Sequence, residues 1–310
     1  LFAGPGSGKT STSVAKGVSI LQTPENRLCM NTFTSAAAGE MRERMQHSLE
    51  KQGFPSPGER FICGTFHAIT KNHYFKHARD RKNILMPNAQ NGMINAMLAR
   101  IERVERKGYT EALGKYQSAL DPSKVEIEKP EHVQFIQLYL QRLRSSNSID
   151  LAMAMRECTI LIGNESIPPL PITHLIGDEM QDADEVQLDL ILHHARKGVK
   201  CTLVADDDQT IYGWRSALGY EGLMTFGRET RCKTIRLEEN FRSREEVVAH
   251  ASRLIAFNNP NRVEKNQRAT RGPGGYLGQC GFSGLDEQCQ VVAHYALDVR
   301  QQGESMAVLA

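Results

Sequence analysis

The stretch Ala3-Gly4-Pro5-Gly6-Ser7-Gly8-Lys9-Thr10 decides the fold of this chain. It matches a glycine-rich phosphate-binding loop in which Ala replaces the first Gly, one small residue for another. Small residues allow backbone N–H groups to curl around a β-phosphate at the N-terminus of a helix. Lys9 supplies a charge for the β- and γ-phosphates, and the Thr10 hydroxyl supplies a ligand for Mg²⁺. The stretch predicts a site for ATP and Mg²⁺; the alternative is a Gly-rich turn without a nucleotide.

Short apolar runs alternate with helical stretches on both sides of this loop. Strands are predicted at residues 28–33, 61–66, 174–176, 201–205 and 234–237. Helices are predicted at residues 36–52, 183–196 and 244–257. Such alternation indicates an α/β domain with a parallel sheet and helices on both faces.

Residues 71–171 break this alternation. They contain helix formers and few strand-like runs, and they predict a mostly helical insertion into the α/β domain. Within them, residues 71–107 hold nine Lys and Arg against three Asp and Glu. A basic stretch can neutralise nucleic-acid phosphates, and the plain alternative is a solvated surface.

The composition excludes several classes of protein. No run approaches the roughly 18 apolar residues that span a bilayer, and no charged-then-apolar leader is present, so neither a membrane partner nor secretion is expected. Seven scattered cysteines form no C-x-x-C pair, which predicts a reduced, cytoplasmic protein without a zinc module or disulfide scaffold. The chain begins at Leu1 and ends in the apolar run 306–310, which predicts a strand, so we expect a fragment of a longer protein.

Two acidic residues follow the predicted strand at 174–176. Asp178 is expected to hold Mg²⁺ and Glu179 to act as the general base toward the attacking water. A bare Asp-Glu pair is more often a solvated turn, and only the phosphate loop makes the catalytic interpretation the better one.

A third polar segment follows the predicted strand at 201–205. Gln209 is placed to hydrogen-bond the γ-phosphate or the attacking water. Tyr212 and Trp214 lie two residues apart and next to Arg215, an arrangement typical of sequence-tolerant binding to single-stranded nucleic acid. A lone Trp in the hydrophobic core is the alternative.

Taken together, these segments resemble the superfamily 1 DNA helicases of the UvrD/Rep/PcrA type. Residues 31–41 are similar to the family's motif Ia, residues 64–67 to motif Ib and residues 237–243 to motif IV. The resemblance covers most of the chain and keeps the motif order. The family's N-terminal glutamine motif and its motifs V and VI are absent, and Met180 stands where relatives usually carry Tyr or Ala.

The resemblance implies roles for further residues. Phe33, Tyr212 and Trp214 would stack on DNA bases, with His67 and Arg215 beside the DNA. Phe241 would stack on adenine, and Arg242 would reach the γ-phosphate. Taken singly, Phe33 fits a core strand, His67 a hydrogen-bonded loop and Arg242 a surface ion pair.

The resemblance also implies an organisation and an activity. A RecA-like ATP-binding domain would comprise residues 1–70 and 172–237, the helical insertion residues 71–171, and the first part of a second RecA-like domain residues 238–310. The implied function is an ATP-dependent helicase or translocase acting 3′ to 5′ on single-stranded DNA and on junctions of single and double strands. Two alternatives remain open, the helicase part of a RecB/AddA-type helicase-nuclease and a nucleotide-dependent DNA-binding module without unwinding activity.

Overall fold

The computed structural model describes residues 1–78, 82–210, 217–258 and 262–308. Its centre is a parallel four-stranded sheet in the order β3 (Phe61–Thr65), β2 (Leu28–Thr32), β6 (His174–Gly177) and β7 (Lys200–Leu203). The register pairs Leu28 with both Phe61 and His174, and His174 with Lys200. All four strands therefore end at the same edge, and the segments that follow them lie close together.

The phosphate loop enters this sheet through a short strand. β1 (Phe2–Ala3) pairs in parallel with β8 (Arg236–Leu237), and its other side meets the chain that follows β7. The Ala3 amide donates to the Ala205 carbonyl at 3.0 Å, and the Phe2 amide donates to the Ile235 carbonyl at 2.8 Å. β1 thus delivers residues 4–8 to the carboxyl edge of the sheet.

Helices cover both faces of the sheet because neighbouring strand residues point in opposite directions. One face packs on α1 (Lys9–Leu21) and α2 (Ser35–Lys51), the other on α3 (Phe66–His77), α7 (Leu151–Gly163), α8 (Glu185–Arg196) and α9 (Gly219–Thr230). Met30 of β2 and Ile176 of β6 pack with α1 and α2. Their neighbours Cys29 and Leu175 pack on the opposite face, with α3, α7, α8 and α9. Two hydrophobic cores follow from this alternation.

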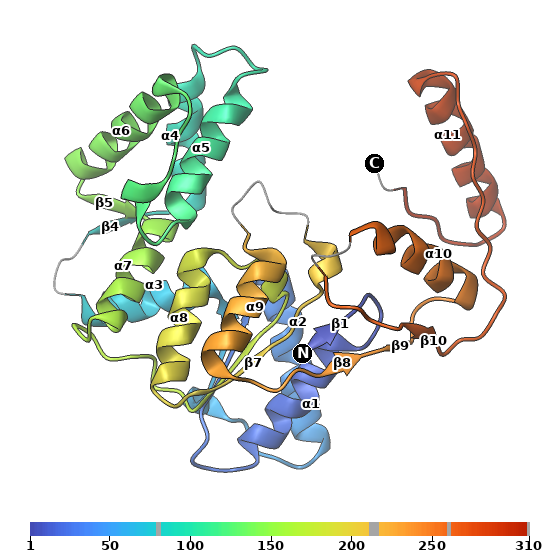
Figure 1. The fold of residues 1–310 in the computed structure, drawn as a ribbon, viewed down its shortest axis with the longest axis horizontal. Helices are drawn as coiled ribbons and strands as arrows, with labels where there is room; N and C mark the ends of the chain where they lie inside the picture. The colour runs from blue at the N-terminus through green and yellow to red at the C-terminus, as the bar shows by residue number, and fades with distance from the viewer. Residues whose placement is uncertain (79–81, 211–216, 259–261, 309–310) are drawn as a thin grey trace.

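A helical unit stands apart from the sheet and is joined to it through α3 and α7 (Figure 1). It consists of α4 (Pro87–Leu98), α5 (Arg106–Ser118) and α6 (Pro130–Ser145), with β4 (Asn83–Leu85) paired to β5 (Ser148–Asp150). Its own core includes Leu113, Phe135 and Tyr139. At its base, Asp150 accepts hydrogen bonds from the Tyr139 hydroxyl at 2.7 Å and the Met153 amide at 2.8 Å, which ties the unit to the start of α7.

The last part of the chain continues from β8. β9 (Glu239–Asn240) pairs in parallel with β10 (Arg268–Ala269), and α10 (Glu245–Ile255) and α11 (Leu285–Gln301) follow as largely exposed helices. Short 3₁₀ turns occupy Gly58–Arg60, Pro122–Lys124, Met180–Asp182, Asp207–Gln209 and Ala256–Asn258.

The strand expected at residues 306–310 was wrong over its described part. Residues 306–308 have no regular secondary structure, and Met306 and Val308 are exposed. An apolar run becomes a strand only when a neighbouring strand supplies backbone hydrogen bonds, and no described segment pairs with it.

The expected fold class, an α/β domain with a parallel sheet and a helical insertion, is confirmed. No helix in the described ranges is both long and apolar enough to cross a membrane.

Candidate nucleotide site and adjoining cleft

The phosphate loop makes a tight turn that leads into the start of α1. Gly6 and Gly8 adopt left-handed backbone angles, with φ of +69° and +80°. The Ser7 hydroxyl donates to the Gly4 carbonyl at 2.6 Å and closes the turn. Gly8 caps α1 without any side-chain hydrogen bond, so the first amides of the helix keep their donors for a ligand. These donors and the positive end of the helix dipole suit a phosphate group.

Lys9 lies between two acidic residues that come from different strands. Its Nζ atom is 3.8 Å from Glu179 Oε2, after β6, and 3.8 Å from Asp206 Oδ2, after β7. The Lys9 side chain is only 12% exposed. The ammonium group is thus held at the carboxyl edge of the sheet, directly beside the phosphate loop.

The acidic pair after β6 has an unusual backbone. Glu179 has a φ of +54°, a left-handed angle that costs a residue with a side chain about 1–3 kcal/mol and that gathers at functional sites. The Met180 amide donates to the Val204 carbonyl at 3.0 Å, which fixes this turn against the end of β7. Sequence alone predicted the pair but not its strained turn.

Asp178 is buried, with 5% of its surface exposed. Burial, together with the neighbouring Glu179 charge, raises the pKa of the Asp178 carboxyl to about 6. One of its oxygens accepts from the Glu179 amide at 3.1 Å. The Asp178 carboxylate and the Thr10 hydroxyl offer the hard oxygen ligands that Mg²⁺ prefers, so this donor set fits the expected ion.

Two residues that sequence analysis did not single out link the acids to Gln209. The Gln181 amide group donates to Glu179 Oε2 at 2.9 Å, and its oxygen accepts from the Asp206 amide at 3.0 Å. The fully buried Asp206 accepts in turn from Gln209 Nε2. Asp206 follows β7 as Asp178 follows β6, and this shared position is the signal that points to it in the sequence.

The segment after β8 contacts the phosphate loop. Asn240 Nδ2 donates to the Pro5 carbonyl at 2.8 Å, and the Phe241 amide donates to the Gly6 carbonyl at 2.9 Å. Asn240 Oδ1 accepts from the Arg242 and Ser243 amides, at 3.0 and 2.8 Å.

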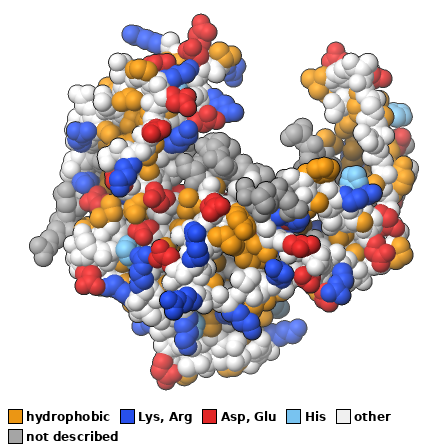
Figure 2. All heavy atoms as spheres, viewed as in Figure 1, with side chains coloured by type: hydrophobic (Ala, Val, Ile, Leu, Met, Phe, Trp, Pro, Cys, Tyr) orange, Lys and Arg blue, Asp and Glu red, His pale blue; other side chains and the backbone are white. Residues whose placement is uncertain are grey.

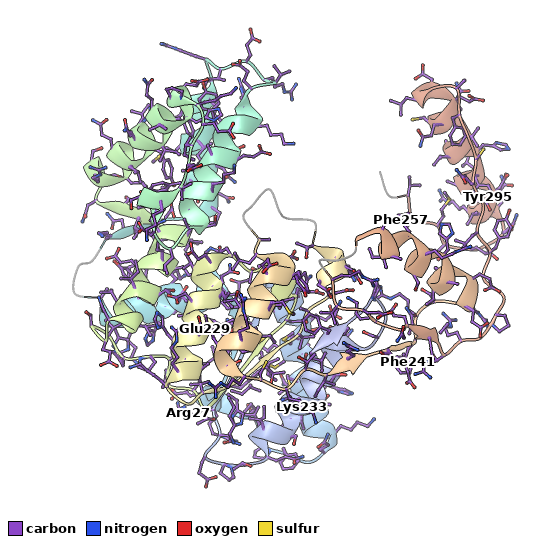
Figure 3. All side chains as sticks on the ribbon, viewed as in Figure 1. Arg27, Glu229, Lys233, Phe241, Phe257 and Tyr295 are labelled. Carbon is purple, nitrogen blue, oxygen red and sulfur yellow. The ribbon has the colours of Figure 1, made fainter. Side chains whose placement is uncertain are left out.

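The side chains of the two residues that follow Asn240 are exposed. Phe241 is 56% exposed, at the junction of the sheet domain and the last part of the chain (Figure 3). The Arg242 guanidinium is exposed and has no ion-pair partner among the described residues. The structure therefore places these two residues at the rim of the loop, with their side chains open to solvent.

A cleft of about 870 Å³ separates the carboxyl edge of the sheet from α4 and α5. Phe33, His67 and Glu179 all line it. The Phe33 ring packs edge-on against Phe66, with ring centroids 6.1 Å apart. Burial lowers the pKa of His67, so its ring favours the neutral form that accepts as well as donates hydrogen bonds.

Among the described residues, the cleft lining combines apolar and uncharged polar side chains with four acidic ones and has no Lys or Arg; the acidic residues are Glu111, Glu179, Asp182 and Asp184. The basic stretch 71–107 contributes only uncharged residues to it. Figure 2 shows Lys and Arg side chains spread over the helical unit, mixed with acidic ones. Asp182 Oδ1 and Gln187 Oε1 are buried without hydrogen-bond partners in the part of the chain that the structure describes.

The structure therefore gathers Lys9, Asp178, Glu179 and Gln209 at one edge, and it brings Phe33 and His67 into the adjoining cleft. Tyr212, Trp214 and Arg215 lie outside the described residues.

Comparison with known proteins agrees with this arrangement. The family model of the UvrD/REP helicase N-terminal domain matches residues 1–225, which contain the phosphate loop, the acidic pair and Gln209. The chain is 29% identical over 313 residues to DNA helicase II of Haemophilus influenzae, covering 93% of this chain and 42% of the relative.

Two further relatives show similar coverage. ATP-dependent DNA helicase Rep of Buchnera aphidicola is 28% identical over 297 residues, covering 86% of this chain and 44% of the relative. DNA helicase II of Escherichia coli is 28% identical over 319 residues, covering 94% and 43%. The chain thus spans less than half the length of these relatives. Because the family model matches most of the chain and includes the edge where the site residues meet, the chain belongs to the UvrD/REP helicase N-terminal domain family.

Proposed function

We propose that this chain is the ATP-binding part of an ATP-dependent DNA helicase or translocase that moves 3′ to 5′ on single-stranded DNA and unwinds duplex at junctions. One observation carries the proposal. Glu179 pairs with Lys9 beside the phosphate loop and also lines the cleft that contains Phe33 and His67. A single turn of backbone therefore belongs to both the nucleotide site and the candidate DNA site.

In the nucleotide site, residues 3–8 surround the phosphates and Lys9 neutralises the β- and γ-phosphates. Thr10 and Asp178 hold Mg²⁺, which supplies charge neutralisation on the transferred phosphoryl group. Glu179 accepts the proton of the attacking water, and Gln209 orients that water or the γ-phosphate. The hydrogen bonds from Asn240 and Phe241 to Pro5 and Gly6 support a place for Phe241 at adenine and for Arg242 at the γ-phosphate.

In the cleft, single-stranded DNA lies with its bases against Phe33 and His67. Tyr212, Trp214 and Arg215 lie outside the described residues, and their proposed contacts with DNA rest on the family resemblance alone. The acidic lining repels phosphates, so the backbone of the DNA faces away from the sheet.

The proposed domain division assigns residues 1–70 and 172–237 to the ATP-binding domain and residues 71–171 to the insertion. The cores agree with it only in part, because the separate core of the insertion comprises residues from Leu85 to Met153. Tyr74 of α3 and Ile162 of α7 belong instead to the core of the sheet, since both helices pack on it. Residues 238–310 begin the second RecA-like domain, whose first strand contact is β9 with β10.

The steady-state ATPase rate of the full-length protein tests the proposal, measured with and without single-stranded DNA. We expect DNA to stimulate the rate, and Glu179→Gln to lower it by about 10²-fold or more, because the amide cannot accept the proton. Duplexes with a 3′ or a 5′ single-stranded tail test polarity, and only the 3′-tailed substrate should be unwound.

The outcomes separate the two halves of the proposal. A rate that ignores DNA removes the DNA track and leaves the nucleotide site standing. An unchanged rate in Glu179→Gln removes the catalytic role of Glu179.

A further inference from the structure

Three consecutive acidic residues follow β7, and a lysine from the last part of the chain is inserted among them. Lys265 Nζ lies 3.1 Å from Asp206 Oδ1 and 2.8 Å from Asp208 Oδ2, and it also donates to Asp207 Oδ1. The Lys265 side chain is 2% exposed, and those of Asp206 and Asp207 are fully buried. The acidic triplet has the spacing of a cation site, and the ammonium group occupies it.

A second basic residue strengthens this attachment at its outer edge. Arg262 donates two hydrogen bonds to Asp208, at 2.8 Å from Nε and 2.9 Å from Nη2. The Val263 amide donates to Asp207 Oδ2. Residues 262–265 are therefore docked on the turn that follows β7. Of the two basic residues, only Lys265 reaches Asp206.

Asp206 connects this cluster to the nucleotide site. Its Oδ1 faces Lys265, whereas its Oδ2 accepts from Gln209 and lies 3.8 Å from Lys9. The buried Asp206 carboxylate thus contacts Lys265 through one oxygen. Its other oxygen faces Gln209 and Lys9, the two residues proposed to contact the γ-phosphate. Three carboxylates this close in a buried place repel one another, and the Lys265 ammonium compensates their charge.

We propose that Lys265 is a positioning residue of the nucleotide site: through Asp206 it holds Gln209 and Lys9 in the arrangement that recognises the γ-phosphate. The inference rests on the proposed function of this edge as an ATP site. The ammonium holds the Asp206 carboxylate in place through its Oδ1 atom, and Asp206 orients the Gln209 amide and the Lys9 chain. Lys265 itself touches no nucleotide.

The proposal separates Lys265 from a residue that merely attaches the last part of the chain. A simple attachment role would be shared with Arg262, which binds the same turn through Asp208 and, within the described part of the chain, forms no ion pair with Asp206. A positioning role belongs to Lys265 alone. It affects the binding of ligands that carry a γ-phosphate more strongly than that of ligands that lack one.

Equilibrium binding of ATPγS and of ADP with Mg²⁺, on the full-length protein, tests the proposal. We expect Lys265→Met to weaken ATPγS binding by about ten- to a hundredfold, the usual effect of removing a group that orients a site residue. The affinity for ADP should fall much less, because Lys9 also contacts the β-phosphate whereas Gln209 serves only the γ-phosphate and the attacking water. Lys265→Arg, which keeps the charge, should restore part of the ATPγS affinity.

Two matched controls accompany these variants. Arg262→Met removes the neighbouring contact of the same segment and should leave the preference for ATPγS over ADP in place. Lys233→Met removes an exposed lysine (Figure 3) for which the described residues provide no ion pair, and it should bind both nucleotides like the wild type. If Lys265→Met does not fold, Lys265→Gln replaces it, because its amide keeps two donors in the cluster without the charge.

Equal weakening of ATPγS and ADP in the Lys265 variants, or the same loss in Arg262→Met, would overturn the positioning role. A wild-type protein that prefers ATPγS but shows no DNA-stimulated turnover would remove the proposed function, and the comparison of the two nucleotides would still decide the role of Lys265. A wild-type protein that binds neither nucleotide would overturn both.

Discussion

Gly6 lies where the phosphate loop contacts the segment 240–242. Replacing Gly6 by Ala adds one methyl group at this contact and so tests whether it exists. A Cβ at Gly6 would come within 2.6 Å of the Arg242 Cβ and 3.0 Å of Asn240 Oδ1. Gly8 has a similar backbone angle, but a Cβ there meets nothing within 4 Å. An Ala at either position would therefore be strained by the left-handed backbone angle. Only an Ala at Gly6 would also collide with neighbouring atoms.

Gly6→Ala should destabilise the protein more than Gly8→Ala. Each substitution brings about 1–2 kcal/mol of left-handed strain, and the collision adds about 1–3 kcal/mol at Gly6. Urea unfolding without nucleotide measures both losses. Equal losses would show that the Asn240–Arg242 segment does not contact the loop in solution.

At the scale of one element, α8 is attached to the chain that enters β6 by a buried histidine. The His194 ring accepts at Nε2 from the Leu170 amide at 3.0 Å and donates from Nδ1 to the Leu190 carbonyl at 2.7 Å. Both contacts are satisfied only by the neutral ring. Burial lowers the pKa of His194 below its usual value.

His194 therefore binds a proton less readily in the native state than in the unfolded chain. The stabilising contribution of His194 is present above its unfolded pKa of about 6.5 and is lost as pH falls through the lower native pKa. Asp184, whose pKa is raised by burial to about 6, acts in the opposite sense, since its contribution is lost as pH rises. The contribution of His194 is therefore measured as the difference in the free energy of unfolding between the wild type and a His194 variant at each pH.

His194→Gln should remove this contribution. Urea unfolding at pH 5, 6 and 7 should give a wild type whose stability rises with pH more steeply than that of the variant. The other buried histidines, such as His73, are unchanged in both proteins and cancel in the comparison. Parallel curves for the two proteins would rule out a neutral His194 as the source of the pH dependence.

At the scale of the whole molecule, the cleft between the sheet and the helical unit unites segments far apart in the sequence. Phe33 follows β2, whereas α4 and α5 of the opposite wall lie more than fifty residues later. The proposed DNA track exists only when these two bodies face each other, as Figure 1 shows them.

Phe33→Ala should weaken single-stranded DNA binding by about 1–3 kcal/mol, the usual contribution of one base stacked on an aromatic ring. Phe75→Ala is the matched control, because Phe75 is exposed on α3 and is absent from the cleft lining. Fluorescence anisotropy with a labelled oligonucleotide measures both. An unchanged affinity in Phe33→Ala, or an equal loss in Phe75→Ala, would contradict stacking at Phe33.

The sequence by itself determined the features that depend on neighbouring residues. Runs such as residues 28–33 and 61–66 alternate with helical stretches, so the parallel sheet was predictable from local pattern. The phosphate loop and the acidic pair were predictable because glycines, Lys9 and Asp178 carry their chemistry at short spacing. The strand at residues 306–310 failed for the opposite reason, since apolar character is local but a partner strand is not.

Only the tertiary structure decided which distant groups meet. Asn240 bonds to Pro5 across 235 residues, and Lys265 enters the acidic turn at Asp206–Asp208 from 57 or more residues away. The acidic lining of the cleft likewise contrasts with the basic stretch nearby in the sequence. Local propensity cannot encode these contacts, because each forms only after packing of the sheet has brought the segments together. Burial then favours pairing of the charged groups, since an unpaired buried charge would destabilise the fold.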